Sequence, residues 1–135
     1  MQWTEKNPAP GDILRTRVRF YHHYGIYVSD DRVIQFGMPD NTGTPNGEIC
    51  VLATDIRTFL HGGSLEVGEP EKEERKTMRP AAEVVAMAES RLGETGYDIL
   101  HNNCEHFVND CVFGKATSGW LEEARAKLRA KLGKK

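Results

Sequence analysis

Apolar and polar positions alternate in the first third of the chain, and this alternation predicts β-strands. Residues 12–20 set leucine, threonine, valine and phenylalanine against three arginines, which indicates a half-buried strand with one basic face. After an interruption at 21–23, residues 24–28 form a second run, rich in aromatic and β-branched residues. A turn signal at 29–32 separates this run from residues 33–37, which we expect to pair with it antiparallel.

The residues around this strand pair mix loops with short elements. Residues 1–11 are polar and end in a proline-rich stretch, so we expect an extended lead-in. Prolines, asparagines and glycines fill residues 38–47, which we expect to be a loop. The elements expected next are a strand over 48–53, a helix over 55–60 with Thr54 as its cap, a short strand over 64–67 and a solvated connection over 68–77.

Helical periodicity dominates the last third of the chain. We expect a helix from Pro80 to Gly93, a second over 104–113, and a third, basic and amphipathic, over 118–132. Because strands come first and helices last, without strand–helix alternation, the predicted class is α+β, an antiparallel sheet packed against helices. The apolar stripe of the first helix consists of Val84, Val85, Ala88 and Leu92.

Composition and charge limit the kinds of protein that this chain can be. With 135 residues, 28% of them charged and 39% hydrophobic, it has the make-up of a single globular domain over 1–135, with its core over about 10–114. The net charge of −2 gives no general attraction to nucleic acid. No apolar run is long enough to span a bilayer, and the N-terminus lacks the layout of a signal peptide. Three cysteines are too few for a disulfide framework, so we expect a cytoplasmic protein.

The densest run of chemically capable residues lies at 102–111, and Cys104 is its candidate nucleophile. Asn103 suits the entry to the expected helix and Gly114 suits its end, which puts Cys104 in the first turn. There the positive end of the helix dipole and the free N–H groups favour a thiolate. The alternative interpretation is that Cys104 is a small buried hydrophobe, as most cysteines are.

A cysteine nucleophile needs a base, and the chain offers five histidines. His106 comes two residues after Cys104, about 200° round the helix, so it cannot face the same site. His61 lies at an expected helix end, and His101 lies in the connection before the cysteine helix. His23 opens the second strand, and a histidine at a strand end can be aimed at a helix N-terminus, as a Cys–His pair requires.

A zinc site is the other interpretation of cysteines and histidines that occur together. Cys104, His106 and Cys111 do not match the spacing of a zinc knuckle, and a helix would separate their side chains. We therefore expect no metal and no other cofactor.

Three segments of the chain together resemble one protein family. They read His-Tyr-Gly-Ile-Tyr-Val at 23–28, Val-Ile-Gln at 33–35 and Asn-Cys-Glu-His-Phe-Val at 103–108. In this order they look like the lecithin:retinol acyltransferase family, which includes the H-Ras-like tumour-suppressor phospholipases/acyltransferases and many bacterial relatives. The resemblance extends from Pro10 to Gly114, which is most of the chain.

This resemblance implies a circularly permuted papain-like fold of the NlpC type, with Cys104 as nucleophile and His23 as general base. Members of the family take an acyl group from a phospholipid ester onto the cysteine and pass it to water, an amine or an alcohol. Two features depart from the family. Gln35 stands where the family usually has a second histidine, although its carbonyl can still accept a hydrogen bond from the imidazole. The chain also lacks the transmembrane helix with which eukaryotic members often end, so a membrane-embedded substrate is implied less directly.

The expected function is cysteine-dependent acyl hydrolysis or transfer on lipid esters or amides, through a thioester on Cys104. The expected partner is an acyl donor such as a phospholipid or an amide, and not nucleic acid. Two alternatives stay open: a weak or inactive binding or regulatory module of the same fold, and a peptidase or amidase of the NlpC type. The basic helix over 118–132 is expected to dock on the domain, and its other interpretation is peripheral contact with a membrane surface.

Overall fold

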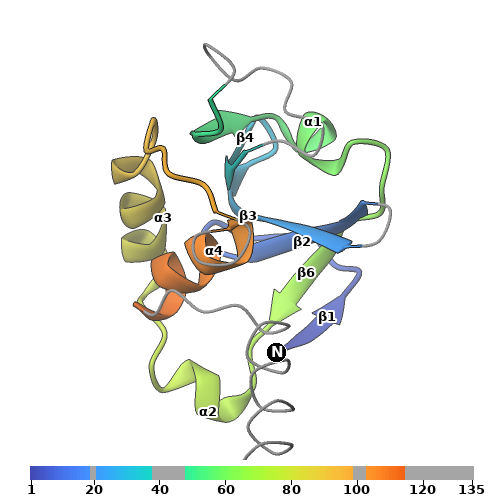
Figure 1. Ribbon diagram of the computed structural model, residues 1–135. Coiled ribbons are helices and arrows are strands. Elements are labelled where there is room, and N and C mark those ends of the chain that lie inside the picture. Colours follow the sequence, from blue (N-terminus) through green and yellow to red (C-terminus); the bar gives the residue numbers. More distant parts are fainter. Residues whose placement is uncertain (19–20, 38–47, 99–102, 115–135) are drawn as a thin grey trace, which may run out of the picture.

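The computed structural model describes residues 1–18, 21–37, 48–98 and 103–114. Within these residues, six strands form one antiparallel sheet in the order β1-β6-β2-β3-β4-β5, with helices packed on both of its faces (Figure 1). The strands are β1 (Gln2–Thr4), β2 (Ile13–Val18), β3 (Tyr21–Ser29), β4 (Arg32–Phe36), β5 (Val51–Thr54) and β6 (Glu66–Glu69). The helices are α1 (Ile56–Leu60), α2 (Lys72–Arg75), α3 (Ala81–Ser90) and α4 (Cys104–Phe113).

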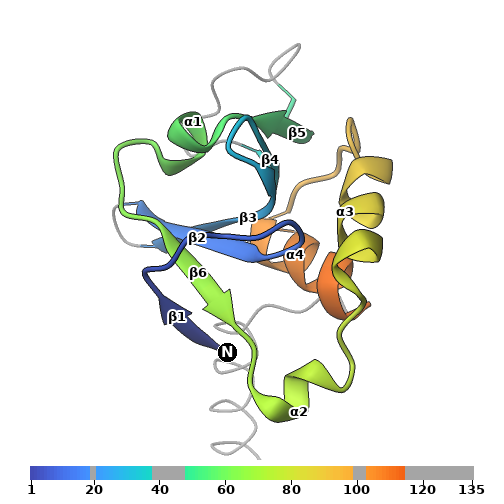
Figure 2. The same cartoon turned by 180° about the vertical axis from the view of Figure 1, so that it is seen from behind.

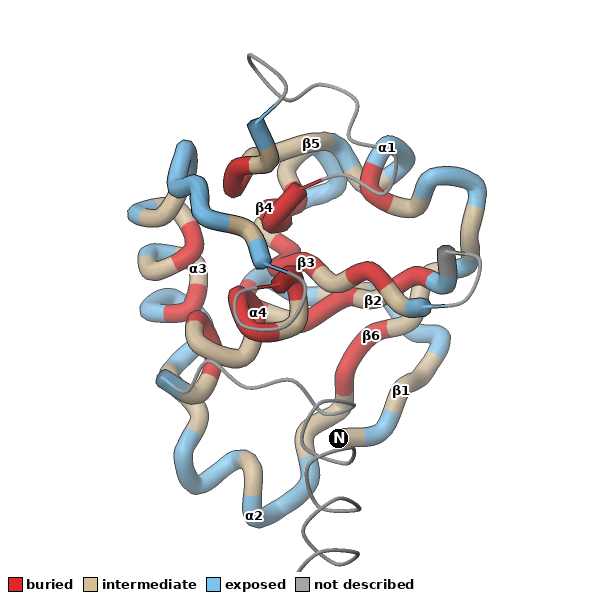
Figure 3. The backbone as a smooth tube through the Cα atoms, in the orientation of Figure 1, coloured by how far each residue is buried: buried red, intermediate tan, exposed pale blue. Residues whose placement is uncertain are grey.

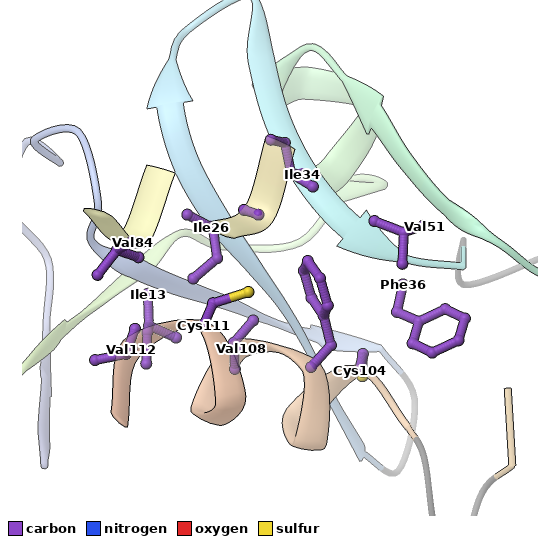
Figure 4. Packing of buried hydrophobic residues seen from close by; sticks show 12 residues of the cluster. Ile13, Ile26, Ile34, Phe36, Val51, Val84, Cys104, Val108, Cys111 and Val112 are labelled. Carbon is purple, nitrogen blue, oxygen red and sulfur yellow. The ribbon is translucent and has the colours of Figure 1, made fainter. Parts of the chain in front are cut away.

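The alternation of side chains along β2 divides the buried residues between the two faces of the sheet. Ile13 packs into a larger cluster beneath α3 and α4, and Leu14 packs into a smaller cluster beneath α1. Figure 2 shows these helices around the central strands from behind, and Figure 3 shows buried stretches in β2, β3, β4 and α4. The larger cluster, shown in Figure 4, comprises Ile13, Ile26, Ile34, Phe36, Val51, Val84, Ala88, Cys104, Phe107, Val108, Cys111 and Val112. The smaller cluster comprises Leu14, Tyr27, Val33, Phe59 and Val67.

The expected hairpin between the second and third predicted strands is present as β3 and β4. Gly25 pairs with Gln35 and Ile26 pairs with Ile34, and Ile26 and Ile34 both belong to the larger cluster. Because side chains alternate along a strand, His23 and Gln35 both point to the opposite face. The hairpin therefore places two of the predicted site residues on the same face of the sheet.

The cysteine-bearing helix α4 begins and ends where its sequence predicts. The side chain of Asn103 accepts hydrogen bonds from the backbone N–H groups of Glu105 and His106, each over 3.0 Å. Gly114 ends the helix with a φ of 73°, in the left-handed region that favours glycine. Because the first N–H groups of a helix have no partner within it, Asn103 determines where α4 starts and thereby where Cys104 sits.

The strand β3 is longer than the hydrophobic pattern predicts. Residues 21–23 were expected to interrupt the sheet, but His22 pairs with Arg17 and His23 pairs with Thr16. The backbone ladder does not require apolar side chains, and the β2 neighbour supplies hydrogen bonds whatever the side chains are. His23 is consequently the third residue of a nine-residue strand and not its first.

Two elements form in segments that the sequence predicts to be irregular. The strand β1 lies in the expected lead-in and adds to the edge of the sheet by pairing with β6. The helix α2 lies in the expected connection over 68–77 and begins with a capping box between Glu71 and Glu74. The strand depends on a partner far away in sequence, and the helix is shorter than a periodic pattern can reveal.

Two predictions about helix ends are wrong by one to three residues. Asp55, not Thr54, caps α1, and its carboxylate accepts a hydrogen bond of 2.7 Å from the backbone N–H of Thr58. The helix α3 ends at Ser90, so Leu92 falls beyond it and is 37% exposed instead of joining the apolar stripe.

The antiparallel sheet with packed helices agrees with the predicted α+β class. In the part of the chain that the structure describes, no helix has the length and apolar character needed to cross a membrane. The helix expected over 118–132, the loop expected over 38–47 and His101 lie outside the described residues.

Candidate active site

Cys104 is the first residue of α4 and is buried against β3. Its side chain belongs to the larger apolar cluster (Figure 4). The residue is 6% exposed. The backbone N–H groups of Tyr24, Cys104 and Glu105 lie close enough to the thiol to lower its pKa. The described pairing between β3 and β4 stops at Gly25, and Tyr24 is the residue that immediately precedes Gly25 in β3. The start of α4 therefore packs beside the point at which these two strands separate.

Burial controls the ionisation of this thiol. Desolvation raises the pKa of Cys104 to about 11, and the nearby charge of Glu105 acts in the same direction. The nearby N–H groups lower the pKa, but by less than burial raises it. The prediction of a resting thiolate at the helix N-terminus is therefore wrong, because the sequence pattern does not reveal how completely the first turn is buried.

His23 is buried in the middle of the sheet and is 3% exposed. Its Nε2 lies 2.7 Å from Oε1 of Gln35, and its ring lies 5.3 Å from the ring of Phe59. Desolvation lowers the pKa of His23 to about 4, although the hydrogen bond to Gln35 opposes this shift. The imidazole is therefore neutral at physiological pH.

The orientation of the Gln35 amide determines the tautomer of His23. The hydroxyl of Thr54 donates to the backbone carbonyl of Asp55 over 3.0 Å, so its oxygen accepts from Nε2 of Gln35 over 2.6 Å. This leaves Oε1 of Gln35 as the acceptor that faces His23, and Nε2 of His23 must carry the proton. The lone pair is thus on Nδ1. The prediction that Gln35 would accept from Nδ1 and leave Nε2 for the thiol is wrong in its choice of nitrogen.

The structure joins two of the three predicted residues directly, on the sheet face that carries α1, while Cys104 packs in the larger cluster on the other face. His23 and Gln35 share a hydrogen bond, while Cys104 contacts Tyr24, the residue that follows His23 in β3. Among the described residues, Cys104 and His23 share no hydrogen bond. Hydrogen bonds between catalytic groups are often long in a free enzyme and shorten when substrate binds.

Two other histidines, His106 and His61, lie near helix termini. His106 lies on α4, and its Nδ1 accepts a hydrogen bond of 3.0 Å from the backbone N–H of Asn103. His61 ends α1 with a φ of 49° and is exposed. In the described residues, no group of three or more histidine, cysteine or acidic side chains is placed to hold a metal ion.

The sequence offers Tyr21 and Tyr24 as residues near the candidate site, but it does not predict how aromatic rings pack around Cys104. The ring of Tyr24 lies 5.8 Å from that of Trp3, and burial raises the pKa of Tyr24 to about 12. The ring of Tyr97 meets Phe36 edge-on at 5.3 Å, and burial together with the charge of Cys104 raises the pKa of Tyr97. Alternation along β3 could have identified Tyr24, but Trp3 depends on a strand that the sequence pattern does not show.

Comparison with known proteins places these residues in a family. The family model for lecithin retinol acyltransferase matches residues 6–117, a range that includes His23, Gln35 and Cys104. This chain belongs to the lecithin retinol acyltransferase family. Membership confirms the resemblance seen in the sequence.

Curated relatives carry two kinds of name. Lecithin retinol acyltransferase of Rattus norvegicus is 32% identical over 134 residues, which cover 84% of this chain and 58% of the relative. The Homo sapiens protein of the same name is 31% identical over 128 residues, covering 80% of this chain and 56% of the relative. Phospholipase A and acyltransferase 3 of Homo sapiens is 28% identical over 125 residues, which cover 86% of this chain and 77% of the relative. The chain thus spans little more than half the length of the lecithin retinol acyltransferases that it matches.

Proposed function

We propose that this protein is a cysteine-dependent acyl hydrolase or acyltransferase that takes its acyl group from a lipid ester. The observation that carries the proposal is the chain of hydrogen bonds from Thr54 through Gln35 to His23, beside the strand position that Cys104 contacts. The names of the relatives point to acyl transfer from lipids. Acyl transfer needs a nucleophile, a base and a group that orients the base, and this arrangement offers all three.

In the proposed reaction, thiol and imidazole begin as a neutral pair. As Sγ of Cys104 attacks the ester carbonyl, Nδ1 of His23 takes the thiol proton, while Nε2–H stays bonded to Gln35. The tetrahedral intermediate collapses to a thioester on Cys104, and the protonated Nδ1 gives its proton to the departing alkoxide. Water or an acceptor hydroxyl or amine then gives a proton to Nδ1 and attacks the thioester, which releases the product and restores the thiol.

Backbone N–H groups are available to stabilise the negative oxygen that forms during attack. The N–H of Glu105 is bonded to the side chain of Asn103, so it serves the helix cap. The N–H groups of Cys104 and Tyr24 face the sulfur in the free protein. We assign these two groups to the oxyanion, because fixed donors at the site of developing charge lower the barrier most effectively.

The proposed reaction does not require a disulfide or a metal. All three cysteines are free and buried, which suits a reducing compartment such as the cytoplasm. The acyl donor would be a phospholipid at a membrane surface that the protein contacts peripherally.

A binding module without turnover is the second candidate. The observation that favours it is the neutral resting pair of Cys104 and His23. Burial raises the pKa of Cys104 and lowers the pKa of His23, and both changes oppose formation of a thiolate–imidazolium pair. An NlpC-type peptidase or amidase would use the same residues on an amide carbonyl.

The deciding experiment is detection of an acyl-enzyme by intact-protein mass spectrometry. The wild-type protein and the Cys104→Ala and Cys50→Ala variants are mixed with short-chain phosphatidylcholine, a p-nitrophenyl ester and an N-acyl amide. We expect a mass increase of one acyl group, stable to washing and cleaved by hydroxylamine, in the wild type and in Cys50→Ala only. An adduct that persists in Cys104→Ala would overturn the nucleophile. No adduct with any donor, together with no turnover, would favour the binding module.

A further inference from the structure

A group of charged and aromatic side chains lies on the α4 face of the β2–β3 pair, next to Cys104. The register places Arg15 opposite Tyr24, and Arg17 opposite His22. Ile13 in β2 packs into the cluster beneath α4, so alternation puts Arg15 and Arg17 on that same face. These four residues form two cross-strand pairs that lead away from the thiol.

The first pair is already occupied by contacts within the protein. Nε of Arg15 donates to Glu66 over 2.8 Å, and its guanidinium lies 4.3 Å from the centre of the Trp3 ring. A further hydrogen bond joins Arg15 to the side chain of Tyr24. Arg15 therefore neutralises Glu66 and holds Tyr24 in place, and its charge is not available to a ligand.

The second pair includes an arginine with unused binding capacity. Arg17 is exposed, and its guanidinium makes no ion pair or hydrogen bond with the described residues. His22 is partly exposed, its Nε2 lies 4.0 Å from Oε1 of Glu66, and its ring lies 6.4 Å from that of Tyr24. Burial and then the positive charges of Arg15 and Arg17 lower the pKa of His22, so the ring is a neutral hydrogen-bonding group near neutral pH.

The second pair is also close to the reacting atom. Tyr24 contacts the Cys104 sulfur, and His22 precedes it by two residues, about 7 Å along a strand. His22 is also close enough to Glu105, the residue after Cys104, for the charge of Glu105 to raise the pKa of His22. A ligand bound between Arg17 and His22 would therefore lie beside the start of α4.

From this geometry we infer that Arg17 and His22 bind the phosphodiester headgroup of the acyl donor. The inference rests on the function proposed above. In a glycerophospholipid, only glycerol carbons and ester oxygens separate the acyl carbonyl from the phosphate, which suits a thiol and an anion site this close together. A guanidinium presents paired N–H donors that match phosphate oxygens, and the neighbouring imidazole adds a further donor.

The first test compares donors that share an acyl chain but differ in the headgroup. Rates of Cys104 acylation are measured for the wild type, Arg17→Gln and the matched control Arg57→Gln, whose arginine lies exposed on α1. We expect Arg17→Gln to slow acylation by short-chain phosphatidylcholine about tenfold or more, because one charge-assisted hydrogen bond is lost. Acylation by the p-nitrophenyl ester should be unchanged. Equal slowing with both donors, or no slowing with either, would overturn the assignment.

The second test measures binding without chemistry. Glycerophosphocholine or inorganic phosphate is titrated into the Cys104→Ala protein, with and without Arg17→Gln, while NMR follows the His22 ring. We expect glycerophosphocholine to shift the His22 signals, and Arg17→Gln to weaken this binding at least tenfold. Arg17-independent binding would overturn the inference, and so would inorganic phosphate binding as tightly as glycerophosphocholine. Arg17-dependent headgroup binding without acylation of the wild type would reject the proposed function and leave the headgroup site standing.

Discussion

Gln35 and His23 meet through Oε1 and Nε2 at 2.7 Å, and this contact leaves Nδ1 as the only basic nitrogen of the imidazole. Thr54 makes the arrangement unique, because its hydroxyl proton is donated to the backbone of Asp55 and its oxygen can only accept from the Gln35 amide. A glutamine thus fixes the tautomer of the histidine without a charge. It stabilises an imidazolium less than a carboxylate would.

The first prediction concerns the loss of this orienting group. We expect Gln35→Ala to form the thioester about tenfold more slowly, since a neutral hydrogen bond contributes about 1 kcal/mol and 1.36 kcal/mol is a factor of ten in rate. Gln35→His should retain activity, His23→Ala should be much slower, and Cys104→Ala should be inactive. Intact-mass kinetics with the p-nitrophenyl ester provide the measurement.

Two controls make this prediction specific. Thr54→Val removes the acceptor that holds the amide and should slow acylation less than Gln35→Ala does, because Oε1 can still reach His23. His22→Ala should leave acylation by the neutral ester unchanged. If Gln35→Ala behaves like the wild type while His22→Ala is severely slowed, the base and its partner have both been misassigned.

The second prediction concerns the ionisation of the nucleophile. Because burial raises the pKa of Cys104 to about 11, the alkylation rate of the free protein should rise about tenfold per pH unit from pH 7 to pH 10. Iodoacetamide labelling, measured for each cysteine by peptide mass spectrometry, reports this rate. Cys111 is the internal control, since it is fully buried and burial raises its pKa to about 12. A rate for Cys104 that levels off near neutral pH would show a thiolate and rule out the neutral pair.

Features set by local sequence could be predicted, and α4 is the best example. Asn103 and Gly114 are local signals for its two ends, and both act as the sequence predicts. The pairing of His23 with Gln35 also follows from the sequence, because strand alternation and a short turn put both side chains on one face. Local position also singled out Cys104 and His23 as candidate nucleophile and base, and the resemblance to the family implies the same two roles.

Features set by distant partners could not be predicted in the same way. The strand β1 exists because β6 pairs with it, and residues 21–23 join β3 because β2 supplies their ladder. Which nitrogen of His23 faces Gln35 depends on the rotamer of the His23 side chain. Which atom of Gln35 faces His23 depends on Thr54, which is nineteen residues from Gln35. The raised pKa of Cys104 depends on how deeply α4 packs, and a one-dimensional pattern does not give depth.

The third prediction concerns stability in acid. The folded pKa of His23 is about 4 and the ordinary value is 6.5, so above pH 6.5 the residue is neutral in both the folded and the unfolded protein. Below pH 6.5 the unfolded chain binds a proton at this position that the folded protein does not. The free energy of unfolding should therefore fall as the pH drops from 6.5 to about 4, with a contribution from His23 on the order of 3 kcal/mol at pH 4.

Urea unfolding at a series of pH values tests this contribution by comparing two matched variants. His23→Asn removes the titrating ring, so its free energy of unfolding should depend less on pH between 6.5 and 4 than that of the wild type. His61→Asn changes an exposed histidine in a left-handed conformation that asparagine tolerates, and it should keep most of the wild-type slope, because the charge of His61 lowers the pKa of His23 by less than burial does. The comparison rests on slopes, so a constant loss of stability from the smaller side chain at position 23 does not affect it. Parallel profiles for His23→Asn and the wild type would mean that His23 is not held neutral by burial, and the neutral pair proposed for the resting site would then have to be abandoned.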